Sequence, residues 1–142
     1  ILNETNHAHI PRTAHHALKE RHYGDFTGKN KDEIKKEFGE AEFQKVRRGW
    51  DTPPPNGESL KDTHMRVVPF YEEHILNDLK QGHNVLVSAH GNSLRALIKH
   101  LEQLSDSDVE HLEIGTGVLH VYEVKDDGTI VSKEIRDHNT TP

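Results

Sequence analysis

The fold is decided by the stretch Val85-Leu86-Val87-Ser88-Ala89-His90-Gly91-Asn92-Ser93-Leu94-Arg95. Its first five residues form a short apolar run rich in β-branched side chains, which is typical of a strand buried on both faces. Gly91 marks a turn, and the apolar residues after it recur at helical spacing, at Leu94, Leu97, Ile98 and Leu101. A strand, a glycine turn and a helix in direct succession are half of a βαβ unit and indicate an α/β fold.

The polar residues of this stretch lie where the predicted strand ends and the predicted helix begins. Ligands of open α/β sheets bind at that edge. The free N–H groups and the positive dipole end of a helix start favour an anion, and His90 can donate to a phosphoryl oxygen. We therefore expect His90, Gly91 and Asn92 to bind phosphate. Taken alone, His90 and Asn92 can also be ordinary turn and cap residues.

Residues 1–30 hold few apolar side chains and predict mostly loop. Ionisable residues crowd the segment Glu20-Arg21-His22-Tyr23-Gly24, and Lys31 follows. Glu20 can exchange a proton with a substrate hydroxyl, Tyr23 can hydrogen-bond a carboxylate or phosphate, and Lys31 can supply positive charge. A solvated charged loop is the alternative interpretation of the same segment.

Two short helices are predicted over residues 31–38 and 40–48, where charged, helix-favouring residues surround a few apolar ones. Arg47 and Arg48 close the second helix and can present two planar guanidinium groups to phosphate or carboxylate, although adjacent arginines also occur on solvated faces. The chain must turn at residues 51–57, because successive prolines there remove backbone donors.

Further along, Ser59 is expected to cap a long helix, with Asp62 three residues on and a kink at Pro69. A small helix is expected from about Ser105. Residues 118–124 and 129–135 flank a turn rich in Asp and Gly, which predicts a β-hairpin.

The bulk properties fit one domain of 142 residues. The net charge is −6 with both signs mixed along the chain, which argues against a nucleic-acid partner. Cysteine is absent, which excludes disulfides and thiolate metal sites. No apolar run approaches the length of a membrane span, so no membrane partner and a cytoplasmic location are expected.

Thirteen histidines raise the question of a metal site. The pairs His7 with His9 and His15 with His16 have no acidic or cysteine partner at a recognisable ligand spacing. We expect no metal, and a histidine-rich metal-binding module remains an alternative.

Several motifs together resemble the 2,3-bisphosphoglycerate-dependent phosphoglycerate mutases of the histidine phosphatase superfamily, in their order and spacing. They are Glu20 to Gly24, Lys31, Arg47-Arg48, Asp51 to Pro55, Gly57 to Leu60 and His90 to Leu97. The resemblance runs from about residue 18 to residue 135. It implies a three-layer α/β fold with a mostly parallel sheet flanked by helices, and residues 1–142 would be the C-terminal two thirds of that single domain.

The resemblance also implies an activity and roles for residues. The family is an isomerase of glycolysis and gluconeogenesis that interconverts 3- and 2-phosphoglycerate through a phosphohistidine, with 2,3-bisphosphoglycerate as primer and without metal. Glu20 would be the general acid and base, and His90 would steady the phosphoryl group. The implied substrate-binding residues are Glu20, Arg21, His22, Tyr23, Lys31, Arg47, Arg48, Gly91 and Asn92. The intact protein is expected to be a homo-oligomer.

One family feature is missing from these 142 residues. The family's nucleophile lies in an Arg-His-Gly segment near its N-terminus, and this sequence contains no such triplet. We expect that the chain is N-terminally truncated, that the first strands of the sheet are missing, and that this chain alone is inactive. The alternatives are a histidine-type phosphatase of the same superfamily and a non-catalytic anion-binding fragment.

Overall fold

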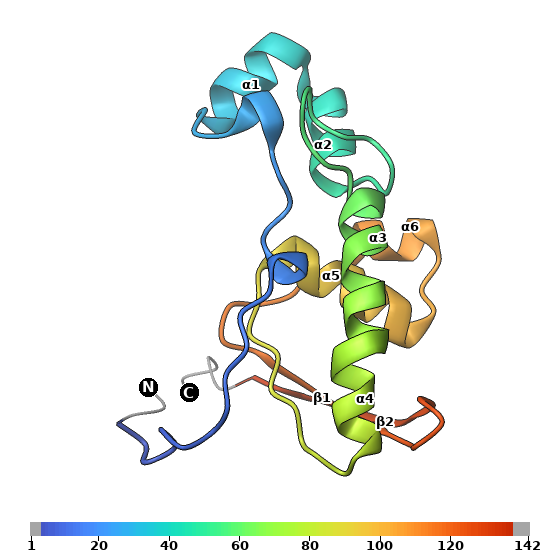
Figure 1. Ribbon diagram of the computed structural model, residues 1–142. Helices are drawn as coiled ribbons and strands as arrows, with labels where there is room; N and C mark the ends of the chain where they lie inside the picture. Colours follow the sequence, from blue (N-terminus) through green and yellow to red (C-terminus); the bar gives the residue numbers. More distant parts are fainter. Residues whose placement is uncertain (1–3, 138–142) are drawn as a thin grey trace.

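The computed structural model describes residues 4–137 (Figure 1). Within this range, two 3-10 turns come first and six α-helices follow, with a π turn between the third and fourth and a hairpin at the end. Their bounds are η1 His16–Leu18, η2 Gly24–Phe26, α1 Lys31–Phe38, α2 Glu40–Arg48, α3 Leu60–Phe70, η3 Tyr71–Ile75 (the π turn), α4 Leu76–Lys80, α5 Gly91–Glu102, α6 Asp106–His111, β1 Leu119–Val124 and β2 Ile130–Arg136. Within this part of the chain, no helix is long and apolar enough to cross a membrane.

The main core lies between α3 and α5. Figure 1 shows α3 and α4 as one long column, with α5 packed beside its upper part. The buried residues of this core are Ala17, Leu60, Val67, Phe70, Tyr71, Ile75, Ala96, Leu97 and Val109. Burying these side chains against one another supplies the main driving force that holds the two helices together.

The start of α3 confirms its predicted cap. Asp62 N–H donates to Ser59 Oγ at 3.0 Å, and Ser59 N–H donates to Asp62 Oδ2 at 2.9 Å. This reciprocal pair satisfies two backbone donors that the helix itself cannot satisfy. Further along, the kink expected at Pro69 corresponds to the π turn, which begins two residues after the proline. Proline provides no backbone N–H, and π turns occur where the regular hydrogen-bond ladder is interrupted.

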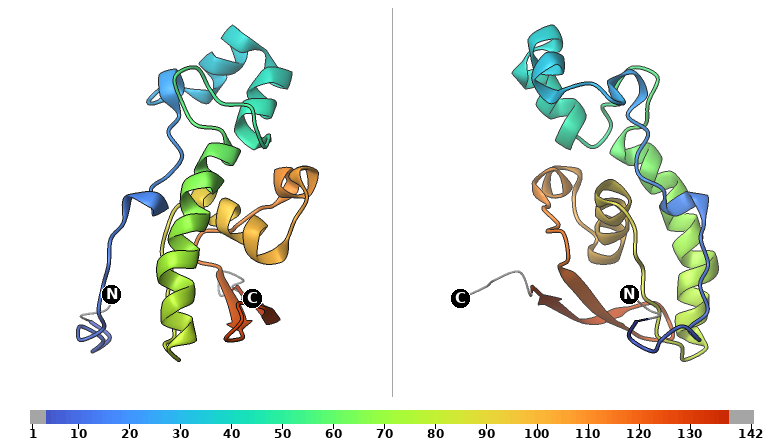
Figure 2. Two further views of the ribbon diagram at one scale, coloured as in Figure 1. Left: turned by 45° about the vertical axis from the view of Figure 1, so that its right-hand side comes forward. Right: turned by 90° about the vertical axis from the view of Figure 1, so that its left-hand side faces the viewer.

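A smaller unit lies at one end of the column (Figure 2). It consists of η2, α1 and α2, and both helices have the bounds that the sequence predicts. Four side chains form its own apolar cluster, namely Phe26, Ile34, Phe43 and Val46. The hairpin of β1 and β2 lies at the opposite end.

The sheet differs from the expectation. Among residues 4–137, the strands form one antiparallel two-stranded sheet, with Leu119 opposite Arg136, and no parallel pair is present. Val85–Ala89 does not form a strand, because none of the strands that the structure describes lies beside it to accept its N–H groups. Val85 and Val87 pack against the main core, whereas Leu86 is 75% exposed. The prediction that both faces of this segment are buried is therefore wrong for these residues.

Candidate active site

Glu20 and the start of α5 meet although they are 72 residues apart in the sequence. Asn92 N–H, in the first turn of α5, donates to Glu20 Oε1 at 3.2 Å, and Arg21 N–H donates to the same oxygen at 2.7 Å. His90 is the cap residue of this helix and is exposed, and its N–H donates to Ser93 Oγ at 3.1 Å. The positive end of the helix thus faces a carboxylate, which is the kind of group that such an end favours.

Tyr23 joins this cluster through the side chain of Asn92. Asn92 Nδ2 donates to Tyr23 Oη at 2.8 Å, and Arg95 Nη1 donates to Asn92 Oδ1 at 3.1 Å. Asn92 and Arg95 are buried, whereas Tyr23 is 37% exposed. The half-buried Glu20 and the exposed Tyr23, His90 and Gly91 therefore form a polar surface above a buried arginine, and this surface is called the α5 cluster below.

Two buried arginines cap the carboxyl end of α2. Arg21 Nη1 donates to Val46 O at 2.9 Å and its Nη2 donates to Arg47 O at 3.5 Å, while Arg95 Nη2 donates to Arg48 O at 3.2 Å. Cations are favourable at a helix C-terminus, where three or four carbonyl groups lack helical partners. Burial lowers the pKa of Arg95 to about 10, and the nearby charges of Arg48 and Arg21 act in the same direction. Arg95 remains charged at neutral pH.

A second arginine system holds the segment that carries Glu20. Arg66 on α3 donates from Nη1 to Ala17 O at 2.5 Å and from Nη2 to Glu20 O at 3.2 Å. Its Nε and Nη2 also pair with the two carboxylate oxygens of Glu58, at 3.0 and 2.9 Å. Glu58 Oε2 accepts a further bond from His22 N–H at 2.9 Å. The bond to Arg66 is the main reason that the pKa of Glu58 is lowered from its ordinary value.

The proline-rich turn closes over the same segment. Asp25 N–H donates to Pro55 O at 2.9 Å. Gly24 has φ +52°, and a Cβ atom there would lie 2.0 Å from Pro55 O. Only glycine fits at this position, because both the backbone conformation and the available space exclude a side chain.

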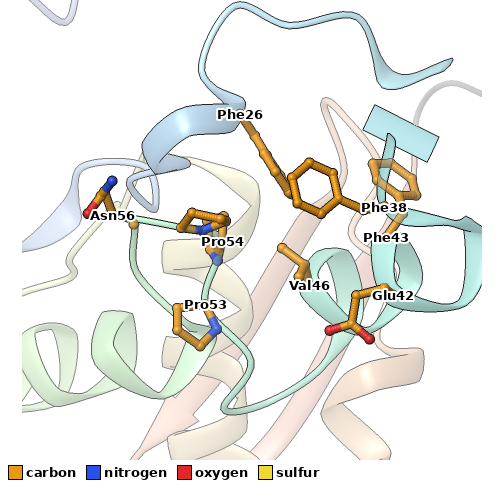
Figure 3. A pocket seen from close by; sticks show the side chains of 10 residues that line it. Phe26, Phe38, Glu42, Phe43, Val46, Pro53, Pro54 and Asn56 are labelled. Carbon is orange, nitrogen blue, oxygen red and sulfur yellow. The ribbon is translucent and has the colours of Figure 1, made fainter. Parts of the chain in front are cut away.

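An apolar hollow of about 390 Å³ lies beside this turn, and its lining includes no residue of the α5 cluster (Figure 3). It is lined by Phe26, Phe38, Glu42, Phe43, Val46, Pro53, Pro54, Pro55, Asn56 and Gly57. Its walls offer few groups that could bind an anion, so the chemistry expected from the sequence belongs to the exposed α5 cluster instead.

The structure brings together only some of the predicted site residues. Arg48 pairs with Glu113 near the α5 cluster, and its carbonyl is held by Arg95. His22 lies beside the cluster, with Nδ1 accepting from Gly24 N–H at 3.2 Å. Within residues 4–137, the exposed side chains of Lys31 and Arg47 make no hydrogen bond to the cluster. Arg21 is 2% exposed and its guanidinium is directed to α2, which indicates a supporting position rather than direct contact with a ligand.

Three contributors were missed from the sequence, namely Arg66, Arg95 and the carboxylate of Glu58 as its partner. One feature of the sequence could have indicated Arg95. It lies three residues after Asn92 and is followed by Ala96, Leu97 and Ile98, which are buried. A charged residue among buried helix positions needs polar partners. Nothing in the sequence marks Arg66, because apart from Glu58 its partners are backbone carbonyls of a distant loop.

His15 stacks on Phe70 and lies close to two other histidine rings. The ring of His15 lies 4.3 Å from that of Phe70 and 4.3 Å from that of His16, and His74 is 5.9 Å away. Burial and the charges of His16 and His74 lower the pKa of His15. Among the residues that the structure describes, no group of three His, Asp or Glu side chains is arranged to hold a metal ion.

The chain is similar in sequence to known enzymes. Residues 1–136 match the model of the histidine phosphatase superfamily (branch 1). The chain is 46% identical over 137 residues to a 2,3-bisphosphoglycerate-dependent phosphoglycerate mutase of Methylorubrum populi, covering 96% of this chain and 65% of that protein. It is also 46% identical over 138 residues to a phosphoglycerate mutase of Schizosaccharomyces pombe, covering 97% and 65%.

Solved structures agree on the fold. A mycobacterial glucosyl-3-phosphoglycerate phosphatase in complex with inorganic phosphate superposes with a TM-score of 0.74 at 22% identity, over 96% of this chain and 68% of that one. The chain spans about 65% of the length of the curated relatives named above. The motifs, the fold and the identity agree, and the chain belongs to the histidine phosphatase superfamily.

Proposed function

We propose that this chain is the larger part of a 2,3-bisphosphoglycerate-dependent phosphoglycerate mutase, which interconverts 3- and 2-phosphoglycerate by phosphoryl transfer. The observation that carries the proposal is the hydrogen bond from Asn92 N–H to Glu20 Oε1, which brings an acid–base carboxylate to a helix start suited to phosphate. Similarity to curated mutases supports the choice of substrate.

In this proposal, the N–H of Gly91 binds a phosphoryl oxygen and His90 donates a further hydrogen bond, while the N–H of Asn92 holds Glu20 beside them. Arg48 and Tyr23 bind the remaining negative charge of the substrate. Phosphoryl transfer passes through a loose, anionic transition state, so donors that are fixed in advance provide most of the catalysis. Glu20 takes the proton of the accepting hydroxyl as the new oxygen–phosphorus bond forms and the phosphorus–nitrogen bond of the donor histidine breaks. In the second half-reaction that histidine takes back the other phosphoryl group, and Glu20 returns the proton to the oxygen that is released.

The phosphoryl donor would be a histidine in an Arg-His-Gly segment primed by 2,3-bisphosphoglycerate, and these 142 residues contain no such triplet. The donors at this site that would bind the phosphates of the primer are the guanidinium of Arg48, the Tyr23 hydroxyl, His90 and the N–H of Gly91. We further propose that residues 1–142 are the C-terminal two thirds of one domain and that Val85–Ala89 is a strand of its mostly parallel sheet.

The test is the interconversion of 3- and 2-phosphoglycerate in the presence of 2,3-bisphosphoglycerate. It is run on this chain alone and on a chimera in which a mutase segment containing Arg-His-Gly precedes Ile1. In the chimera, Glu20→Gln is expected to lower kcat by about 10² or more, because the accepting hydroxyl loses its proton acceptor. The exposed Glu73→Gln is the matched control and should leave kcat within about twofold.

We expect no turnover from the 142-residue chain alone, and turnover by a preparation free of other enzymes would contradict this. An unchanged kcat in Glu20→Gln would remove Glu20 from its role. Release of inorganic phosphate in place of the second isomer would favour the phosphatase alternative.

A further inference from the structure

A chain of hydrogen bonds runs from the interior to the exposed surface of the α5 cluster. Arg95 Nη1 donates to Asn92 Oδ1 at 3.1 Å, and Asn92 Nδ2 donates to Tyr23 Oη at 2.8 Å. The first two members are 5% and 7% exposed, whereas Tyr23 is 37% exposed. The last member is therefore the one that a ligand can reach.

The direction of this chain is set at its buried end. A guanidinium can only donate, so the Asn92 atom that faces Arg95 must be its carbonyl oxygen. The amide NH₂ then faces Tyr23 and donates to the hydroxyl oxygen. Because that oxygen already accepts a bond from Asn92, the tyrosine proton is free to point outward toward a ligand oxygen.

Arg95 is itself fixed by further bonds. Besides Asn92 and Arg48 O, it donates from Nη2 to Val109 O at 2.5 Å, just after the middle of α6. Arg21 lies over the ring of Tyr23, with its guanidinium carbon 5.0 Å from the ring centre. Two cations thus flank the pair formed by Asn92 and Tyr23, and both favour an electron-rich ligand on the exposed side.

We propose that Arg95 is a positioning residue which, through Asn92, makes the Tyr23 hydroxyl a hydrogen-bond donor to the anion bound at the start of α5. This rests on the anion site of the proposed function. Arg95 itself does not touch the ligand. Its effect is to exclude the opposite orientation, in which the Asn92 oxygen would face Tyr23 and draw the hydroxyl proton inward.

The test is a double-mutant cycle on the binding of 3-phosphoglycerate and of inorganic phosphate to the 142-residue chain, measured by calorimetry. Tyr23→Phe and Arg95→Gln are each expected to weaken binding of 3-phosphoglycerate about five- to tenfold, since each removes one hydrogen bond to the ligand. The double variant should be no weaker than either single one, because both changes remove the same bond. A purely structural role of Arg95 would instead give additive losses.

A second variant covers the case in which Arg95→Gln does not fold. Asn92→Asp is nearly isosteric and pairs with Arg95, but its outer oxygen cannot donate and so reverses the tyrosine hydroxyl. It should weaken binding in the presence of Tyr23 by at least threefold more than in the Tyr23→Phe background, where only the added negative charge acts.

Matched controls lie on the hairpin, away from the site. Tyr122→Phe removes a hydroxyl bonded to Glu102, and Arg136→Gln removes a charge paired with Glu134, and neither should change affinity. If the unmodified chain binds neither anion, the proposed anion site fails and this proposal fails with it. If the chain binds 3-phosphoglycerate but the losses are additive, or equal in both backgrounds for Asn92→Asp, only the role of Arg95 is overturned.

Discussion

Arg66 and Glu58 hold a loop that has almost no regular structure of its own. The N–H groups of one guanidinium serve two kinds of partner, namely the carboxylate of Glu58 and the carbonyls of Ala17, Lys19 and Glu20. A planar group with five donors can make such a set of bonds, and an ammonium group cannot. The position of the Glu20 backbone therefore depends on α3.

Glu58→Gln is expected to lower the free energy of unfolding by about 1–3 kcal/mol, because a partly buried guanidinium loses its charged acceptor. Urea unfolding of the 142-residue chain at neutral pH measures this. Glu37→Gln is the control, since the pair of Glu37 with Lys29 is exposed and should contribute less than about 0.5 kcal/mol.

The same pair predicts a pH dependence. The pKa of Glu58 is lower in the folded chain than its ordinary value of 4.5, so its contribution is complete above pH 4.5 and is lost as the pH falls through the folded pKa. The difference between Glu58→Gln and the unmodified chain should therefore shrink in acid. A difference that stays constant down to pH 3 would contradict the role of the ionised carboxylate.

Some site residues can be predicted from the motif in which they stand, and others only from contacts that form in the folded chain. Glu20, Tyr23 and Asn92 could be proposed from the sequence, since each stands in a motif with a chemical meaning. Arg66 could not, because its partners become visible only when the loop is folded against α3. The burial of Arg21 could not be predicted either. Its side chain is only 2% exposed because of tertiary packing, which the neighbouring sequence does not indicate.

At the scale of elements, the capping box of α3 can be tested directly. Ser59→Ala is expected to lower the free energy of unfolding by about 1–2 kcal/mol, since the Ser59 side chain is buried and satisfies the N–H of Asp62. Thermal and urea unfolding measure the loss. Ser88→Ala, at an exposed position outside the helices, should have an effect below about 0.5 kcal/mol, and an equal effect of the two would count against the cap.

Helices were predicted well because their signals lie within the segment. Asn30, Ser59 and Ser105 each cap the helix that follows, and the bounds of α1 and α2 match the expected ranges. The hairpin was also predicted, since its turn lies between its strands. Val85–Ala89 differs because a strand depends on partners that are often distant in sequence, and residues 4–137 provide none.

For the molecule as a whole, residues 84–89 are expected to exchange their amide hydrogens faster than any other segment near the core. The N–H groups of residues 84–89 have no hydrogen-bond acceptor among the described residues, although Val85 and Val87 pack on the core. Amide hydrogen exchange followed by mass spectrometry should show fast exchange there and slow exchange in α3 and α5. In the chimera with the preceding mutase segment, protection of residues 85–89 is expected, and equally fast exchange would contradict their place in a sheet.

The hydrogen bond between Asn92 and Glu20 is also expected to form late in folding. It joins residues 72 positions apart, so it can form only after the chain between them has collapsed. The helices, whose contacts are local, can form earlier. A state with all helices formed but without the contact between Asn92 and Glu20 would then have a normal far-ultraviolet circular dichroism spectrum and would not bind ligand. Recovery of ligand binding during refolding should lag behind recovery of helix content.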